Sequence, residues 1–410
     1  MEKLTVNMRA VTPIFLGGAQ PEKGAELRPP SVKALLRFWY RAIDPDYAVH
    51  HHEAKLFGSA DRKEGQGLFL LRILESARSY SEPWTPGHQS NQTHPRYGQR
   101  PDHSSEDLHT WTLDGLRYFS QFLGHSKSKR ASIPPCEEVT LSLVFKKTPE
   151  AADRRRILAA TWLLGHFGGV GSRSRRGFGS LALQSWGAST PQDWPELNEL
   201  AVANGKDTPE GWVCAVESAR NCFKAWFGSA PSNDHTVLDG NARMLLFDRG
   251  CLSWEEALGE AGLAMQTFRQ RYDLSDPGSD YYRVKRHLCR QVLPNRPSHP
   301  GCTMGAAPLP RMPDRAAFGL PLMFRFSSLN NATTTFRGEV HDRSASRIHV
   351  RVIRIGRHYH PLYLRLSGPL LEDGEQMTET KNGRTSLSPP ADTILGEFWR
   401  TLPPGREVSW

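Results

Sequence analysis

Between Gly168 and Gly179 the chain reads GGVGSRSRRGFG, a segment whose residue types suit the binding of phosphate groups. Glycine lets backbone N–H groups approach a ligand closely and adopts positive φ, while arginine offers forked donors that match phosphate geometry. We therefore expect a polyanion as ligand, and RNA is the first candidate. The alternative is a glycine-rich turn with solvated arginines. The candidate contacts are Gly169, Gly171, Arg173, Arg175 and Arg176.

The elements on either side of this segment exclude two common phosphate-binding loops. Residues 151–167 have helical periodicity and residues 180–186 alternate like a strand, so the loop joins a helix to a strand. A dinucleotide-binding fingerprint has the reverse order, strand before helix. A Walker loop is excluded because Gly177 is followed by Phe178 instead of by Lys and Ser or Thr.

A second set of basic residues is predicted on a helix that begins at Ser31, its expected N-cap. The apolar side of its helical wheel holds Val32, Leu35, Leu36, Trp39 and Ile43. The opposite side holds Lys33, Arg37, Tyr40 and Arg41, and Arg28 comes just before the helix. Positive charge at one-turn intervals with an intervening aromatic ring suits a phosphate backbone, and a solvated helix face is the alternative.

The order of the expected elements indicates a fold. Strands at 4–11, 68–74, 139–146 and 180–186, with helices after the first and third, make a βαββαβ unit. That order is ferredoxin-like, or RRM-like, with two helices on one face of a four-stranded antiparallel sheet and the other face free for RNA. A long insertion, 77–135, separates the second and third strands and includes a candidate helix at 113–123. After this helix come Lys127, Lys129 and Arg130, a further candidate phosphate contact.

Composition indicates an ordinary globular protein with an acidic partner. The 410 residues, 38% of them hydrophobic, are enough for two or three domains, and the net charge of +9 favours nucleic acid. With no signal peptide and no 18-residue apolar span, we expect a soluble, cytoplasmic protein without a membrane partner.

We expect the cysteines to form neither disulfides nor a metal site. The six cysteines are scattered and contain no C-x-x-C pair, so we expect no disulfides. The set most similar to a metal site is His287, Cys289, His299 and Cys302, but its spacing is not that of zinc ligands. We expect no metal and no cofactor.

Three segments together resemble the RAMP proteins of CRISPR effector complexes. They are FLGGAQPEKGAELRPPSVKALLRFWYRAI at 15–43, LFGS at 56–59 and LLGHFGGVGSRSRRGFGSL at 163–181. Within the RAMP superfamily, the resemblance is to the family of the first RAMP subunit of the type III-B, or Cmr, complex. In the second half, FGLPLMFRF at 318–326 and RSASRIHVRVIRI at 343–355 look like the strand-forming end of a second RAMP fold. The family pattern has a proline where Ser346 is followed by Arg347, so the second half departs from it at this point.

The resemblance implies an α+β protein with two ferredoxin-like (RRM-like) RAMP domains joined by a helical connecting region. The first domain would span residues 1–188, with the insertion 77–135. The second would span 189–410. Within it, the sequence itself indicates a helical segment at 209–292, with helices expected at 212–227, 254–272 and 281–292.

The resemblance also implies a function. The protein would be an RNA-binding subunit of a crRNA-guided complex in antiviral defence, placed where the 3′ part of the crRNA and the incoming target RNA are held. Its partners would be both RNAs, the backbone RAMP subunit and a second RAMP subunit at the head end of the complex. No catalytic residue is implied.

Two other functions stay open at this point. Some RAMP proteins are metal-independent endoribonucleases that process the crRNA precursor, and His125, His166 or His341 would be the acid–base candidates here. A stand-alone RRM-type protein is the other alternative, because RGFG at 176–179 matches the opening of the RRM signature. The residues that follow, Ser180 to Leu183, lack the aromatic rings with which RRM proteins stack on bases.

Overall fold

The computed structural model describes the whole chain except a set of segments about which no structural statement is made. These are residues 18–19, 21–22, 48–50, 61–64, 76–104, 122, 124–129, 229–234, 236, 271–277, 293–306 and 380–385. Within the described ranges, no helix combines the length and apolarity that crossing a bilayer requires.

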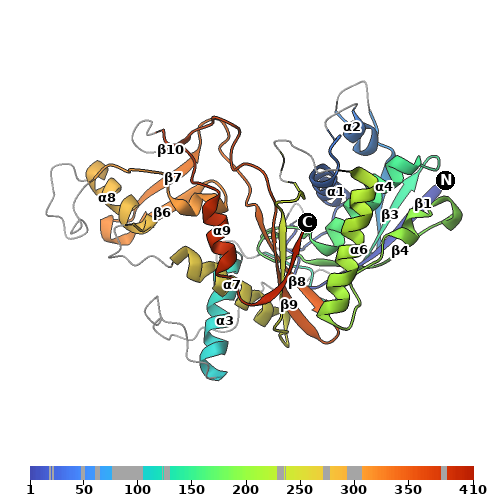
Figure 1. The fold of residues 1–410 in the computed structure, drawn as a ribbon, viewed down its shortest axis with the longest axis horizontal. Helices are drawn as coiled ribbons and strands as arrows, with labels where there is room; N and C mark the ends of the chain where they lie inside the picture. The colour runs from blue at the N-terminus through green and yellow to red at the C-terminus, as the bar shows by residue number, and fades with distance from the viewer. Residues whose placement is uncertain are drawn as a thin grey trace.

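The first half of the chain forms a four-stranded antiparallel sheet with the order β2-β3-β1-β4. Its elements follow the sequence β1 (Glu2–Ala10), α1 (Pro29–Ile43), β2 (Phe69–Glu75), β3 (Glu138–Phe145), α4 (Ala151–His166) and β4 (Leu181–Ala188). Helices α1 and α4 pack against each other (Figure 1). This strand order and connectivity are those of a ferredoxin-like unit, so the predicted βαββαβ arrangement is confirmed.

Alternation along β1 decides which face of this sheet is covered. Leu4, Val6 and Met8 are buried, whereas Lys3 and Asn7 are exposed on the opposite face. Helix α1 begins earlier than expected, at Pro29, with Arg28 at its N-cap position and no side-chain cap. The prediction that Ser31 caps the helix is therefore wrong. Proline at the first helical position explains the difference, because its fixed φ starts a helix without a side-chain cap.

The second half repeats the topology. Its elements are β5 (Arg243–Phe247), α7 (Trp254–Gln270), β8 (Ile348–Ile355), β9 (His358–Arg365), α9 (Thr393–Arg400) and β11 (Gly405–Ser409), and the sheet order is β11-β5-β9-β8. Strand β5 lies inside the 209–292 segment that we expected to be helical, so that expectation is corrected. The strand is short and its residues 244–247 are all buried, a pattern that does not separate a strand from a turn of buried helix.

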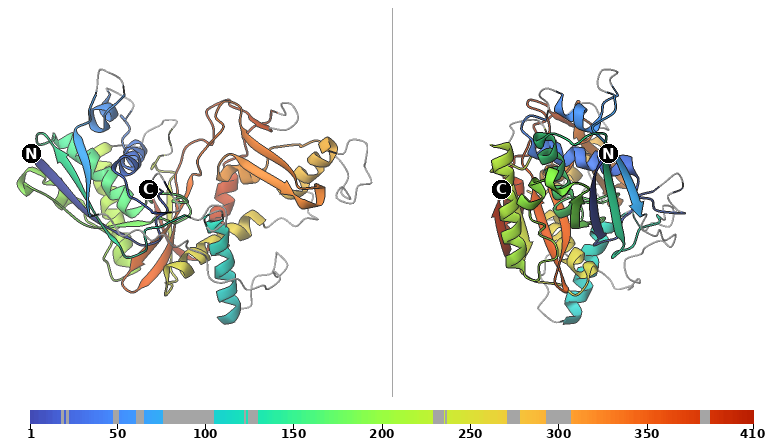
Figure 2. Two further views of the ribbon diagram at one scale, coloured as in Figure 1. Left: turned by 180° about the vertical axis from the view of Figure 1, so that it is seen from behind. Right: turned by 90° about the vertical axis from the view of Figure 1, so that its right-hand side faces the viewer.

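An inserted subdomain extends from the second unit between α7 and β8, at the end of the molecule opposite the N-terminus (Figure 2). It contains α8 (Asp280–Val292), β6 (Leu322–Phe326) and β7 (Ala332–Gly338), and β10 (Met377–Glu379) completes a sheet with the order β10-β7-β6. The 318–326 segment therefore belongs to this separate sheet, not to the second ferredoxin-like sheet as its resemblance suggested. Cys289 on α8 is disulfide-bonded, which corrects the expectation of no disulfides.

Two further helices, α6 and α3, connect the two units. Helix α6 (Pro209–Phe227) packs its buried face into a hydrophobic core that also contains residues of β1, β5 and β9. Helix α3 (Ser105–Ser120), from the long insertion, packs closely on α7 of the second unit, where Gly115, Gly259 and Gly262 leave no room for a Cβ. The short elements are α2 (His52–Phe57), α5 (Glu196–Glu199) and the 3₁₀ turns Pro191–Asp193, Asp314–Phe318 and Ser327–Leu329. The insertion of the first unit thus joins the second unit as well.

Candidate nucleic-acid interface

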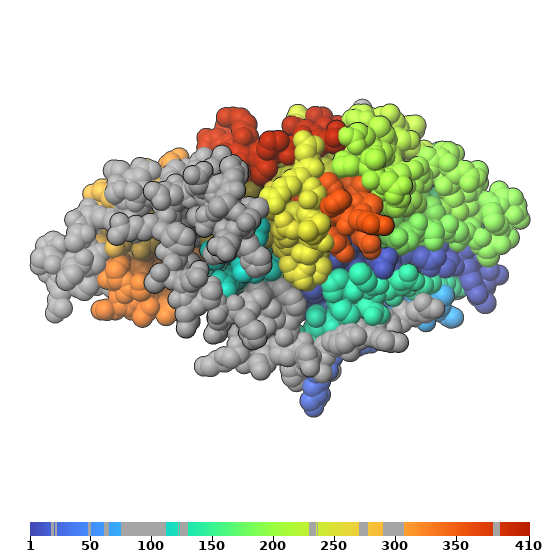
Figure 3. All heavy atoms as spheres, turned by 90° about the horizontal axis from the view of Figure 1, so that it is seen from below, coloured from blue at the N-terminus to red at the C-terminus, as the bar shows by residue number. Residues whose placement is uncertain are grey.

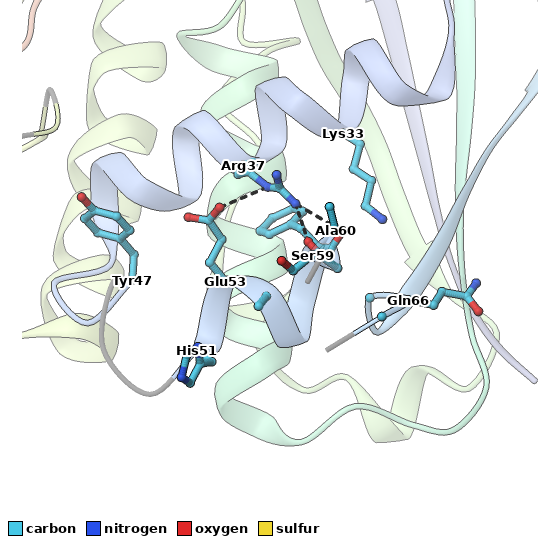
Figure 4. Close-up of a pocket in the computed structure, with 13 residues that line it drawn as sticks. Lys33, Arg37, Tyr47, His51, Glu53, Ser59, Ala60 and Gln66 are labelled. Carbon is cyan, nitrogen blue, oxygen red and sulfur yellow. Dashed lines mark hydrogen bonds and ion pairs between the residues drawn. The ribbon is translucent and has the colours of Figure 1, made fainter. Parts of the chain in front are cut away.

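A hollow of about 620 Å³ lies beside the basic side of α1 (Figure 4). Lys33 and Arg37 point into it from α1, and Glu53 on α2 lies across from them. Glycines at 58, 65 and 67 form part of its wall. Two of the residues predicted to bind RNA therefore share one concave surface.

The guanidinium group of Arg37 donates hydrogen bonds to the C-terminal end of α2. Its Nη2 donates to the carbonyls of Gly58 at 2.8 Å and Phe57 at 3.4 Å, and its Nε lies 3.3 Å from a carboxylate oxygen of Glu53. Terminal carbonyls of a helix have no partner inside the helix, so a guanidinium group at this place caps them. Arg37 thereby orders the wall of the hollow, and part of its charge is compensated by Glu53.

The charge of Arg41 is compensated more completely, by the same carboxylate. Its Nε and Nη2 each lie 2.6 Å from Glu53, and this hydrogen bonding raises the pKa of the Arg41 guanidinium. Tyr40, expected on the same basic side, is fully buried, and burial raises the pKa of its phenol. The predicted continuous basic track along α1 is therefore interrupted, because Glu53 pairs with the last two arginines and Tyr40 packs in the core.

Lys33, unlike Arg37 and Arg41, does not pair with Glu53. Its Nζ lies 5.2 Å from the centroid of the Phe69 ring, and burial, followed by repulsion from Arg37, lowers the pKa of its ammonium group. No carboxylate within the described ranges forms an ion pair with it. Arg28 is exposed at the start of the helix and donates to the carbonyl of Gly17 at 3.2 Å.

The glycine-arginine loop lies against the second ferredoxin-like unit. The N–H of Val350 on β8 donates to the carbonyl of Arg175 at 3.1 Å, and Arg176 forms a parallel bridge with Val350. The Arg175 side chain donates to the carbonyl of Ser346 at 3.1 Å and lies 5.5 Å from the Phe38 ring. These contacts fasten the loop to the edge of the second sheet.

Arg176 also points into the interface between the two ferredoxin-like units. Its guanidinium lies 5.7 Å from the Phe119 ring and contacts the sulfur of Met265, and burial lowers the pKa of Arg176 to about 10. Arg175 and Arg176 therefore turn inward instead of projecting from the loop, and their role as RNA contacts stays a prediction. Packing between the units explains the difference, because their stems cover apolar surface while their charged ends reach carbonyl and aromatic groups.

The loop glycines serve close packing. Gly171 has φ +88° and a Cβ there would lie 2.5 Å from the carbonyl oxygen of Phe15. Gly169 pairs with Ser180 in an isolated bridge, and the N–H of Ser172 donates to Phe15 at 2.8 Å. Gly171 thus lets the loop lie tightly on the chain segment that leads to α1.

A smaller basic patch remains at the loop. Arg130 is exposed and its Nη1 lies 2.5 Å from the Ser172 hydroxyl, while Arg173 donates to the carbonyl of Gln121 at 2.6 Å. Burial, with repulsion from Arg130, lowers the pKa of Arg173. Lys127 and Lys129 lie outside the described residues. The structure therefore brings Arg130 to Arg173, and leaves the pair as a cationic surface beside the loop.

Comparison with known proteins agrees with this architecture. Residues 7–182 match the family model described as the RAMP superfamily. These residues make up less than half of the chain, and through them the first ferredoxin-like unit is similar to RAMP proteins. The Pyrococcus furiosus protein described as CRISPR system Cmr subunit Cmr1-2 is 25% identical over 197 residues, in an alignment that spans 45% of this chain and 96% of that relative.

Two solved structures share the fold of this chain. The crystal structure of apo Cmr1 from Pyrococcus furiosus is 17% identical, covers 100% of both chains and has a TM-score of 0.56. A chain of the type III-B Cmr-beta complex, solved by cryo-EM with cognate target RNA, AMPPnP and ssDNA, is 12% identical, with 97% and 98% coverage and a TM-score of 0.50. The predicted α+β fold is confirmed.

One buried arginine that joins the two units was missed by sequence reasoning. Arg351 on β8 is buried, its Nη1 donates to the carbonyl of Leu164 at 3.2 Å, and its Nη2 donates to the carbonyl of Leu181. Burial lowers the pKa of this guanidinium to about 9. The signal was the RIHVRVIRI pattern, in which Arg351 lies mid-strand between Val350 and Val352.

The candidate acid–base histidines have structural surroundings. His166 is buried, its Nδ1 lies 2.8 Å from the carbonyl of Trp162, and its Nε2 accepts the N–H of Ala203 at 3.0 Å. Burial lowers the pKa of His166 to about 3, so the ring is neutral. His341 is exposed beside Glu375, whose hydrogen bond raises the pKa of the imidazole. His125 lies outside the described residues.

The metal-like set, which its spacing had already set aside, and the RRM-type alternative can be compared with the described residues. His287 contacts Glu379 at 2.7 Å through Nε2 and accepts the N–H of Leu309 at 3.1 Å, while His299 and Cys302 lie outside the described residues. In the part of the chain that the structure describes, no group of three His, Cys, Asp or Glu residues could hold a metal. At the described strand positions, the face of the first sheet opposite α1 and α4 carries no aromatic ring for stacking on bases.

Proposed function

We propose that this protein is an RNA-binding subunit of a crRNA-guided type III-B CRISPR effector complex. In this role it holds the 3′ part of the crRNA, the incoming target RNA or both through backbone contacts. Its partners are other Cmr-type subunits, and the complex acts in the cytoplasm in antiviral defence. We assign residues 1–188 and 189–410 to its two RAMP domains.

The observation that carries this proposal is the full-length agreement with the Cmr1 fold, combined with the relationship to Cmr1-2. A RAMP-matching unit followed by a second unit of the same topology, in one chain, is an architecture shared along 100% of both chains. The sequence relationship spans 96% of the relative named as a Cmr subunit. Both support a subunit role in such a complex.

Cationic side chains of the first unit support a contact with RNA backbones. Arg28 and Arg130 are exposed, Lys33 and Arg173 are partly buried, and the chain carries a net charge of +9. In RNA-guided complexes, base pairing between guide and target supplies the sequence specificity, and the protein recognises phosphates and helical geometry. We therefore expect these residues to bind RNA without base preference.

Co-purification from cells that express the complete set of effector subunits tests the proposal. We expect a tagged chain to retain the other subunits and a guide RNA of defined length. A parallel sample treated with ribonuclease before capture separates subunits held by protein contacts from subunits held through RNA. Recovery of the tagged chain alone, without RNA or subunits in the untreated sample, would overturn the proposal.

We further propose that this subunit does not cut RNA itself. Labelled crRNA-precursor repeat RNA, incubated with the purified chain in EDTA, should remain intact, since His166 is buried and neutral. A discrete cleavage product that disappears in His341→Ala would contradict this and indicate a metal-independent nuclease.

A further inference from the structure

A second hollow, of about 220 Å³, opens where the two ferredoxin-like units meet. It is lined by the end of β1, by β4, by the segment 204–207 and by the β8–β9 hairpin. On the face shown in Figure 3, the hairpin (orange) lies between the N-terminal strand (blue) and the segment after β4 (green). The hollow therefore exists only when both units are docked.

Three cations from three separate segments line this hollow: Arg9 of β1, Lys206 of the connecting segment and Arg354 of β8. No carboxylate within the described ranges forms an ion pair with any of them. The Nε of Arg9 is buried and has no hydrogen-bond partner among the described residues. Three cations and one carboxylate, that of Asp207, line the hollow, which leaves an excess of positive charge inside a concave surface.

Its other lining groups add polarity. Asp207 and Gln184 offer oxygen acceptors. The guanidinium of Arg354 lies 5.9 Å from the centroid of the Tyr359 ring. The volume is below that of ordinary pockets for drug-sized ligands, which begin at about 300 Å³. Three cations with adjacent acceptors in so small a space match one phosphate with its attached sugar, whose hydroxyls need acceptors.

We propose that this seam hollow binds a single phosphate–sugar unit of an RNA backbone. This inference rests on the proposed RNA-binding function and adds a contact that is separate from Lys33. Arg9 shares its side of β1 with Lys3 and Asn7, the face opposite α1, so the two sites lie on opposite faces of the first sheet. RNA bound in the seam hollow contacts both units at once.

The reactivity of the Cys136 thiol reports directly on whether the hollow is occupied. Its thiol is free and exposed, and the residue lines the hollow, so an occupant shields it from alkylation. The rate of Cys136 modification by N-ethylmaleimide, followed by peptide mass spectrometry of the full chain, is measured with orthophosphate, adenosine 5′-monophosphate or a single-stranded RNA at low salt. Cys214, exposed on α6 and away from the lining, reports non-specific protection.

Arg354→Gln is the test variant and Arg357→Gln the matched control. Both arginines are exposed on the β8–β9 hairpin, and only Arg354 lines the hollow. We expect RNA to protect Cys136 in the wild type and in R357Q, and R354Q to abolish most of that protection. RNA affinity should fall roughly fivefold in R354Q, and its salt slope by about 0.7, the value for one phosphate contact with a single strand.

Three results overturn the inference. RNA that binds the wild type without slowing Cys136 modification removes the hollow as a contact while leaving the proposed function intact. Protection by the mononucleotide or orthophosphate but not by RNA assigns the hollow to a free ligand. Equal loss of protection in R354Q and R357Q shows a general charge effect. If the chain, alone and in its complex, binds no RNA in any assay, the proposed function itself fails.

Discussion

Lys33 differs from the other cations of α1 in what surrounds its charge. Arg37 and Arg41 share the carboxylate of Glu53, whereas Lys33 lies at the mouth of the larger hollow with an aromatic ring beneath it. An uncompensated cation gains most when a phosphate arrives, because no existing ion pair has to be broken. Of the α1 residues predicted to bind RNA, Lys33 therefore has the surroundings most suited to that role.

Replacing Lys33 by Gln should weaken RNA binding and lower the salt slope by about 0.7, the loss expected for one contact with a single-stranded backbone. Lys224→Gln, on the exposed side of α6, is the control and should leave the affinity unchanged. Filter binding at several salt concentrations measures both quantities. Equal slopes for K33Q and the wild type would exclude Lys33 as a phosphate contact.

His166 makes a separate prediction about acid stability. Its pKa of about 3 in the fold lies below the ordinary value of 6.5, so the unfolded chain binds the proton more readily. Stability from this group is therefore fully present above about pH 6.5 and is lost as the pH falls towards 3. The loss is about 1.4 kcal/mol per pH unit in that window.

Urea unfolding at pH 7 and pH 5 measures this effect. His166→Gln should be less stable at pH 7, because the side chain fills a buried site between Trp162 and Ala203. Its stability should also change less between the two pH values than that of the wild type. An unchanged pH dependence in H166Q would mean that other groups, such as the buried His349 with its lowered pKa, account for the acid sensitivity.

At the scale of elements, the glycine-arginine loop is a structural joint. Its backbone pairs with β8, its turn lies on the segment before α1, and two of its arginines cover the seam between the units. The same glycines and arginines that suggested a phosphate cradle are used largely for contacts within the protein. Loss of the loop conformation should therefore affect folding before it affects RNA binding.

Gly179→Ala tests this role of the loop. Gly179 has φ +67°, and a Cβ there would lie 1.9 Å from the carbonyl oxygen of Val170, a backbone atom that cannot move aside cheaply. We expect a loss of more than about 2 kcal/mol of stability, from backbone strain and overpacking together. Gly187→Ala, where nothing lies within 4 Å of the added Cβ, is the matched control and should be nearly neutral.

Thermal or urea unfolding of the two variants gives the comparison. If Gly179→Ala were as stable as Gly187→Ala, the loop would have to be adaptable, and a phosphate-binding role for its backbone would regain support.

At the scale of the whole molecule, exposed cations are distributed over both units. Arg28 and Arg130 belong to the first, which also carries the partly buried Lys33, and Arg354 belongs to the second. The net charge of +9 adds a long-range attraction for nucleic acid. An RNA strand that reaches several of these cations displaces condensed counterions at each contact. The affinity of the complete chain should therefore depend steeply on salt.

With six or more phosphates neutralised, the affinity for RNA should fall about a thousandfold between 50 and 200 mM salt. The slope of log K against log salt, from filter binding, is the measurement. A neutral salt such as potassium glutamate should be run beside potassium chloride to separate cation release from anion competition. A flat dependence in both salts would contradict backbone binding as the main source of affinity.

Local patterning determined much of this fold. Apolar alternation located the strands of the first unit to within a few residues, and helical periodicity located α4, α6, α7 and α8, because each element buries one face that the sequence records directly. The glycine-arginine segment and the basic residues before and on α1 were also identifiable, and the resemblance of these segments to RAMP proteins agrees with the family match.

Only the tertiary structure decided what those charges face. Glu53 lies 12 residues from Arg41 and pairs with it, Val350 comes from the other half of the chain to bind the loop, and Arg351 reaches across to α4 and β4. The seam hollow of Arg9, Lys206 and Arg354 likewise draws on three distant segments. Residue type sets what a side chain can bind, but packing between distant segments determines whether its charge is compensated inside the protein or remains available for RNA.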